Sequence, residues 1–160
     1  MENTFSPQEL LKIAIGVEEN GKNLYETLEN KAKSEKIKAI WKYLKEQEEI
    51  HRQIFKQMLD DVDNYIVYEF SPGEYDAYLK AIASSYIFTK GLIEKKITEL
   101  FNSELEAVDF GIYIEKESIL ALSALKEYIT SDKKSVLNKI IAEERKHLVS
   151  LTDLKQDILK

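Results

Sequence analysis

The chain contains only two histidines, and the residues around them restrict what it can fold into. Each histidine ends a Glu-x-x-His element, Glu48 to His51 and Glu144 to His147. Residues three apart lie on one face of an α-helix, so each element can direct a carboxylate and an imidazole to the same point. The pattern predicts two helices that each carry a paired oxygen and nitrogen donor.

A further glutamate precedes each element at nearly the same distance. Glu18 lies 30 residues before Glu48, and Glu115 lies 29 residues before Glu144. The rise of an α-helix is about 1.5 Å per residue, so two helices that fold back on each other midway bring both glutamates to one height. The halves therefore repeat one unit, which consists of a glutamate, a hairpin turn and a Glu-x-x-His element.

Helix-capping signals place the turns between the paired glutamates. Ser6 opens a capping box with proline at the first helical position, and similar boxes open at Ser71 and Ser103. Ser34 can cap the second helix of the first hairpin, and Thr130-Ser131-Asp132 is typical of a turn followed by a cap. The main helices that these signals and the apolar periodicity predict span about 7–33, 34–60, 103–129 and 133–158.

These helices predict an all-α fold, a four-helix bundle with one long crossover. The sequence has 160 residues, of which only 5 are Gly and 2 are Pro, and its 44% hydrophobic content can fill a core without cross-links. We expect a single domain over 1–160, with helical hairpins at about 7–60 and 103–158. The crossover, 61–102, should contain an extra helix that starts near Pro72.

Composition limits the partners of the chain. The net charge is -6 and no basic stripe is present, which argues against nucleic acid. No apolar run approaches the roughly 20 residues needed to span a bilayer, and the N-terminus has no features of a secretory signal. We therefore expect a cytoplasmic protein with no membrane partner.

The chain has no cysteine, which excludes disulfides, zinc–thiolate sites and iron–sulfur clusters. Any redox chemistry must use oxygen and nitrogen ligands. Electrons that sustain such chemistry must come from outside the chain.

The paired glutamates and histidines lie on apolar helix faces. Four carboxylates buried in such a core would be prohibitively unfavourable if unpaired, whereas two divalent cations would neutralise them and leave the imidazoles as neutral ligands. Donors without thiolate favour two Fe ions, with Mn possible. The same set holds carboxylate-bridged metal pairs in other helix bundles. The predicted metal ligands are Glu18, Glu48, His51, Glu115, Glu144 and His147.

Four segments resemble the rubrerythrin-type branch of the ferritin-like di-iron family, and the resemblance extends over nearly the whole chain. It implies that the family's bridging and terminal carboxylates correspond to the four glutamates above, and its histidine ligands to the two histidines. Small residues, Gly21 and Ser118, follow the first glutamate of each hairpin by three, as in the family. The segments are IGVEENGKNLY (15–25), LKEQEEIHRQIF (44–55), GIYIEKESILAL (111–122) and IIAEERKHLVSL (140–151).

The chain departs from full rubrerythrins in two respects. They carry a rubredoxin domain with a four-cysteine iron, which is absent here. They also carry an extra carboxylate three residues after the third-helix glutamate, where this chain has Ser118, and Glu117 is only two residues on. We therefore expect slower peroxide turnover than in a full rubrerythrin.

Other side chains allow two interpretations. Tyr25, seven residues after Glu18, is either a hydrogen-bond donor to a ligand carboxylate or an ordinary core residue. Trp41 is expected to pack in the core rather than to relay electrons. The six ligands could themselves be two structural His–Glu pairs with surface glutamates. The acids beside the ligands should be solvated if the helical register is correct, and they are Glu19, Glu49, Glu117 and Glu143.

Three functions remain open from the sequence. The first is a redox enzyme that reduces hydrogen peroxide or O2 with an external electron donor such as a rubredoxin-like protein. The second is a ferroxidase that stores iron in a hollow shell, and the third is a non-enzymatic iron or oxygen sensor. Aromatic residues crowd the crossover, where they either pack onto the bundle or form the interface of a homodimer.

Overall fold

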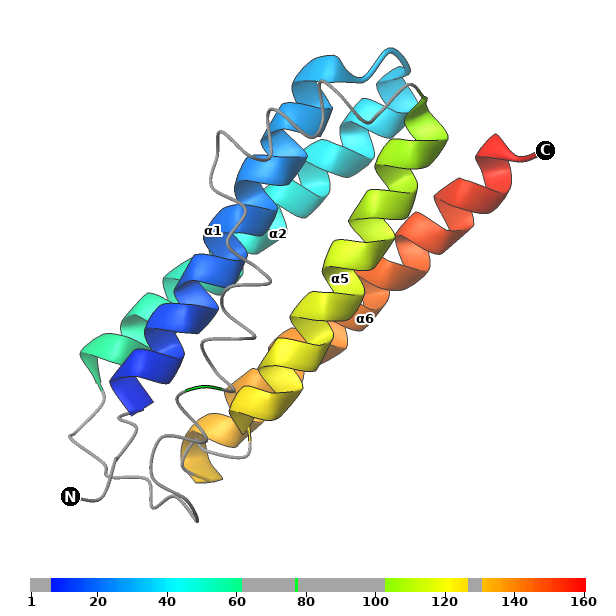
Figure 1. Cartoon of the computed structure of the whole chain (residues 1–160). Helices are drawn as coiled ribbons and strands as arrows, with labels where there is room; N and C mark the ends of the chain where they lie inside the picture. Colours follow the sequence, from blue (N-terminus) through cyan, green and yellow to red (C-terminus); the bar gives the residue numbers. More distant parts are fainter. Residues whose placement is uncertain (1–6, 62–76, 78–102, 127–130) are drawn as a thin grey trace.

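Four helices form the part of the chain that the computed structural model describes, namely residues 7–61, 77, 103–126 and 131–160. Their order along the chain and their placement are shown in Figure 1. The helices are α1 (Pro7–Lys31), α2 (Glu35–Asp60), α5 (Glu104–Lys126) and α6 (Ser131–Ile158).

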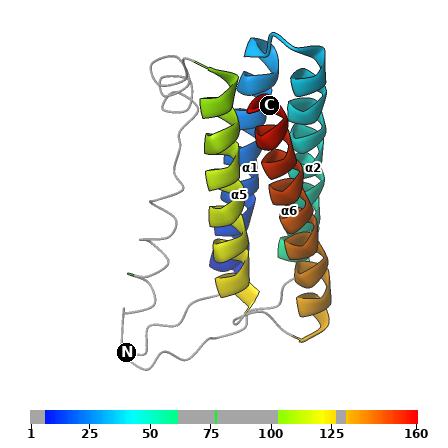
Figure 2. The ribbon, with the colours of Figure 1, turned by 90° about the vertical axis from the view of Figure 1, so that its right-hand side faces the viewer.

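The helices pair into two hairpins that pack side by side. Helix α1 packs along α2 and α5 along α6, while α1 also contacts α5 and α2 contacts α6 (Figures 1 and 2). Helix α2 ends at the end of the bundle opposite to the start of α5 (Figure 1), which is the arrangement that one long crossover requires. The predicted four-helix bundle is confirmed. None of the described helices combines the length and apolar composition needed to cross a bilayer.

The helix boundaries agree with the capping signals to within a few residues. The Ser103 hydroxyl accepts a hydrogen bond from the Glu106 backbone N–H at 3.2 Å, so that cap is confirmed. Ser34 is the N-cap of α2, but its side chain makes no capping bond. Helix α6 already begins at Ser131, so the turn and cap predicted at residues 130–132 were placed about two residues too late.

Several predictions concern residues that the structure does not describe. They are the capping boxes at Ser6 and Ser71, the end of the third helix beyond 126 and the extra helix of the crossover. The single-domain assignment also stays a prediction.

The buried residues of α2 follow one another at alternating intervals of four and three. This spacing is the seam of a left-handed helix bundle, in which core side chains of one helix insert between those of its neighbours. Two of the predicted metal ligands occupy seam positions, so they replace core side chains. The buried residues of the helix are Ile37, Trp41, Leu44, Glu48, His51, Phe55 and Met58.

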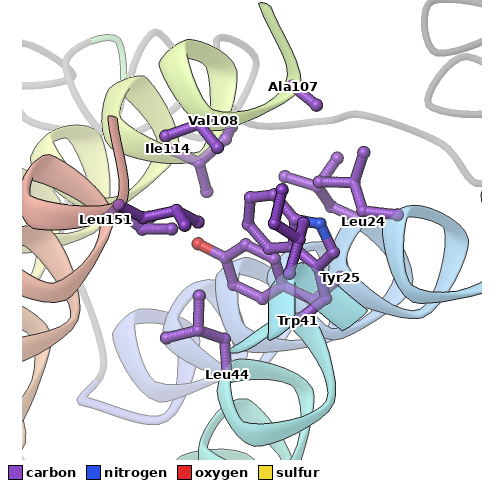
Figure 3. Close-up of a cluster of buried hydrophobic side chains, with 11 residues drawn as sticks. Leu24, Tyr25, Trp41, Leu44, Ala107, Val108, Ile114 and Leu151 are labelled. Carbon is purple, nitrogen blue, oxygen red and sulfur yellow. The ribbon is translucent and has the colours of Figure 1, made fainter. Parts of the chain in front are cut away.

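Apolar side chains form two main clusters, one on each side of the predicted ligands. Along every helix, the ligands stand between residues of the first cluster and residues of the second. Figure 3 shows the first cluster, in which Trp41 lies beside Tyr25 and faces α5. A Cβ at Gly111 would lie 3.1 Å from Leu151 and 3.4 Å from Trp41, so glycine is the residue that lets α5 pack against this indole.

Removal of one side chain from this cluster should destabilise the bundle. Leu44 is fully buried, whereas Leu120 is 58% exposed. We expect Leu44→Ala to lower the free energy of unfolding by about 2–5 kcal/mol, because it leaves a cavity among packed side chains. Leu120→Ala should change it by less than about 0.5 kcal/mol. Denaturant titration of the metal-free protein measures both values, and equal effects would contradict the assigned core.

Candidate metal centre

The polar side chains buried within the described helices gather between the two apolar clusters. Each exposes 5% or less of its surface. They comprise the six residues predicted from the sequence as metal ligands together with one serine: Glu18, Glu48, His51, Glu115, Ser118, Glu144 and His147.

Every helix contributes two seam positions, three residues apart, to this layer. On α2 and α6 both positions are donors, a glutamate and a histidine, whereas on α1 and α5 the glutamate is followed by a small residue. The reason is steric on α1, since a Cβ at Gly21 would lie 3.0 Å from Cδ of Glu48 and 3.2 Å from its Oε2. A side chain at position 21 would therefore displace the Glu48 carboxylate.

The donor atoms form two groups that overlap. One group consists of Glu18, Glu48, His51 and Glu144, and the other of Glu48, Glu115, Glu144 and His147, with the donor atoms of each group within 4.8 Å of one another. Glu48 and Glu144 belong to both groups, which is where bridging carboxylates would stand. The imidazole rings lie side by side, with centroids 5.8 Å apart and planes 20° apart.

Many of these buried atoms have no hydrogen-bond partner in the described part of the chain. They include both carboxylate oxygens of Glu18, Oε2 of Glu115, Oε1 of Glu144 and Nδ1 of His51. His51 Nδ1 and Glu144 Oε1 approach to 2.8 Å, but without hydrogen-bond alignment. Buried oxygens left without donors are costly unless cations neutralise them, so the donor set fits two divalent metal ions.

Tyr25 supports the centre from the first apolar cluster. Its hydroxyl donates a buried hydrogen bond to Oε1 of Glu115 on α5. Its ring stacks on Trp41, with centroids 5.7 Å apart and planes 13° apart (Figure 3). Of the two interpretations that the sequence allowed, the structure shows the hydrogen-bond donor, which fixes one oxygen of a predicted ligand. Trp41 is a core residue that holds the tyrosine in place.

Glu143 has a contact that the sequence analysis did not expect. Its Oε2 lies 2.8 Å from Nε2 of His51, on the side of the ring away from the other donors, although the side chain is 44% exposed. The residue is exposed to solvent as expected, but its contact with a predicted ligand was not expected. Its position directly before Glu144 is the only signal in the sequence, and that signal does not reveal that α2 is the neighbouring helix.

The remaining adjacent acids confirm the helical register. Glu19 forms an ion pair with Arg52 at 2.9 Å. Glu49 forms ion pairs with Arg52 at 2.9 Å and with Lys22 at 2.8 Å. These side chains are partly exposed at the α1–α2 surface. Glu117 is likewise only partly buried. The inward-facing glutamates are therefore those that the spacing predicted.

Burial and mutual repulsion shift the pKa values of the carboxyl groups in the metal-free centre. Burial, together with the charges of Glu144 and other neighbouring glutamates, raises the pKa values of Glu18 and Glu48 well above their usual range. Burial and the charge of Glu144 raise the pKa of Glu115 to about 8. Burial alone would also raise the pKa of Glu144, but its contacts with His147 and His51 hold it far below the usual range.

The pKa values of the two histidines are also raised, but for a different reason. Burial alone would lower the pKa of each imidazole. Contacts with Glu144 and other glutamates outweigh burial and raise the pKa of His51 to about 9. Contacts with Glu115 and Glu144 do the same for His147 and raise its pKa to about 10. The metal-free centre therefore retains protons at neutral pH, and two divalent cations would displace them.

These shifts predict how the stability of the metal-free protein depends on pH. A group whose pKa is raised by folding stabilises the fold below its unfolded pKa, and this contribution is lost as the pH rises through its folded pKa. For Glu115 this range extends from about 4.3 in the unfolded chain to about 8 in the folded protein. The two histidines act in the same sense at higher pH. The unfolding free energy of the metal-free protein should therefore fall as the pH rises from about 5 to 8.

Denaturant titrations in a chelating buffer at several pH values measure this slope. Glu115→Gln should flatten it, because glutamine does not titrate. With metal bound the slope should reverse, since the ions require deprotonated ligands. A metal-free stability that rises across this range would contradict the buried, proton-retaining centre.

Comparison with known proteins places the chain in a family. A solved structure of a protein from Thermotoga maritima, described as a ferritin-like diiron-carboxylate protein, superposes with a TM-score of 0.69. The sequences are 24% identical and the match covers 98% of each chain, which supports the fold. No significant match is found among curated proteins. The rubrerythrin family model matches residues 9–155, so the chain belongs to the rubrerythrin family.

Proposed function

We propose that the chain binds two iron ions and reduces hydrogen peroxide or O2 with electrons from an external donor. The observation that supports this most is the overlap of the two donor groups, because Glu48 and Glu144 lie in both. Two overlapping sites in an apolar core are what a metal pair requires, whereas two separate His–Glu pairs would not need shared carboxylates. Carboxylate and imidazole donors without thiolate favour iron, or else manganese.

The chain's own residues would hold the ions and shape their surroundings. Glu18 and Glu115 would be terminal ligands, Glu48 and Glu144 shared ligands, and the histidines would bind through Nδ1, which faces the carboxylates. A reduced iron pair supplies two electrons, one from each ion, and Lewis acidity. The apolar clusters on both sides would keep bulk water from the centre and preserve the strength of these interactions.

Electron supply has to be external. Reduction of one hydrogen peroxide to two waters consumes two electrons and two protons, and the chain has no cysteine-bound iron to return the electrons. A small electron-transfer protein of the rubredoxin type would meet this need.

Metal content tests the centre itself. After reconstitution with ferrous iron and removal of free metal, we expect close to two iron ions per chain by elemental analysis. Glu115→Gln should lower this content strongly, because it removes a charged donor, and it should leave the metal-free helical fold intact. Glu117→Gln on the same helix is the matched control and should retain both ions. Retained fold with a metal content near zero in the unchanged protein would refute the proposed site.

Stopped-flow absorption tests the chemistry. The diferrous protein should be oxidised rapidly by one equivalent of hydrogen peroxide and should turn over only with an added electron donor. Because Ser118 stands where full rubrerythrins have a carboxylate, Ser118→Glu should raise the turnover rate. A much faster reaction with O2 than with peroxide, together with a large hollow assembly in solution, would favour a ferroxidase. A diferrous protein inert towards both oxidants would leave a sensor or structural role.

A further inference from the structure

The internal repeat duplicates the donors of the proposed metal centre but not the residues that contact these donors. The two histidines show this most directly. Nε2 of His51 lies 2.8 Å from a carboxylate oxygen of Glu143. Nε2 of His147 is buried, and no described residue forms a hydrogen bond with it.

The repeat identifies the residue that corresponds to Glu143. The Glu-x-x-His elements are offset by 96 residues, so the counterpart of Glu143 is Gln47. Gln47 lies one helical turn after Tyr43, whose ring meets that of His147 edge-on with centroids 5.9 Å apart. The helix face next to His147 therefore carries a neutral amide where the face next to His51 carries a carboxylate.

The terminal glutamates differ as well. Both oxygens of Glu18 are buried, and neither accepts a hydrogen bond from a described residue. Glu115 has only Oε2 free, because Oε1 accepts the hydrogen bond from Tyr25. The repeat explains this too, since the counterpart of Tyr25 in the other half is Leu122, which has no donor to offer Glu18.

The contact behind His51 favours one half of the centre. A carboxylate that accepts a hydrogen bond from the distal N–H of an imidazole fixes the ring and strengthens the other nitrogen as a ligand, and loss of such a partner typically lowers metal affinity about 10–100-fold. The Tyr25 hydroxyl orients Glu115 in the other half, but it is neutral, whereas the Glu143 carboxylate makes a charge-assisted contact with His51, which is the stronger kind. Among the described residues only His51 has a carboxylate behind its ring, so this contact favours the Glu18–His51 half.

We propose that the two halves of the centre bind metal unequally and in order. The Glu18–His51 half takes the first divalent cation, with Glu143 as the positioning residue behind His51. The Glu115–His147 half takes the second cation more weakly. This inference rests on the proposed metal centre and adds which half is filled first.

The chain provides its own probe, because it has one histidine in each half and no others. The full chain labelled with 15N-histidine is titrated with Zn2+, a redox-inert divalent ion, and both rings are followed by NMR. The His147→Gln variant assigns the remaining ring signal to His51. We expect the His51 ring to complete most of its change within the first equivalent, and the His147 ring to respond mainly to the second.

Two matched variants test the cause. Glu143→Gln should reduce the affinity of the first site about 10–100-fold and bring the two responses together. Gln47→Glu places a carboxylate in the equivalent position of the other half, and it should tighten the second site by a comparable factor. Because the two changes act on opposite rings, a general loss of packing cannot produce both results.

The outcomes separate this inference from the proposed function. If both rings respond in parallel from the first addition, or His147 responds first, the centre binds metal but the ordered filling is wrong. If Glu143→Gln leaves the order and the first affinity unchanged, Glu143 is not its source and the inference fails. If neither ring responds to two equivalents of Zn2+ and elemental analysis also finds no iron, the metal centre itself is refuted.

Discussion

Four carboxylates that are buried in one layer are the constraint on which the rest of the structure depends. An ionised carboxylate loses several kcal/mol of hydration on burial, and neighbouring charges of the same sign increase the penalty. The metal-free protein reduces this penalty when some glutamates retain protons and when Glu144 pairs with both imidazoles. The raised pKa values of Glu18 and Glu48 and the lowered pKa of Glu144 correspond to these two effects. Two divalent cations would reduce the penalty further, because their four positive charges balance the four carboxylates.

The bundle accommodates this layer because the ligands use seam positions that already point inward. A heptad seam places two inward positions, three apart, on each helix at each level, and four helices therefore offer eight. Six are occupied by donors, and Gly21 and Ser118 occupy the other two. The glycine is required by volume, since the Glu48 carboxylate fills the space of its missing side chain. The apolar clusters at both ends then stabilise the fold independently of metal.

The buried positions of the four glutamates and two histidines could be predicted from the sequence, because they depend on spacing within each helix and hairpin. Helical periodicity separates Glu18 from Glu19, and the nearly equal spacing of the repeats aligns the two hairpins without knowledge of their packing. Contacts between helices of different hairpins were harder to predict. Tyr25 was a candidate donor, but its acceptor, Glu115, lies 90 residues away on α5. Glu143 reaches His51 only because α6 lies beside α2. Spacing within one helix carries no signal for either contact.

The same distinction separates the positions at which the two halves of the chain agree from those at which they differ. A change in any of the six donors would alter the charge or geometry of the whole centre, because the two donor groups share Glu48 and Glu144. A residue that only contacts a donor, such as Glu143 or Tyr25, affects that one donor and not the whole centre. The halves have the same glutamates and histidines but differ at Glu143 against Gln47 and at Tyr25 against Leu122. A repeat that is symmetric in its predicted ligands thus gives the two donor groups chemically different surroundings.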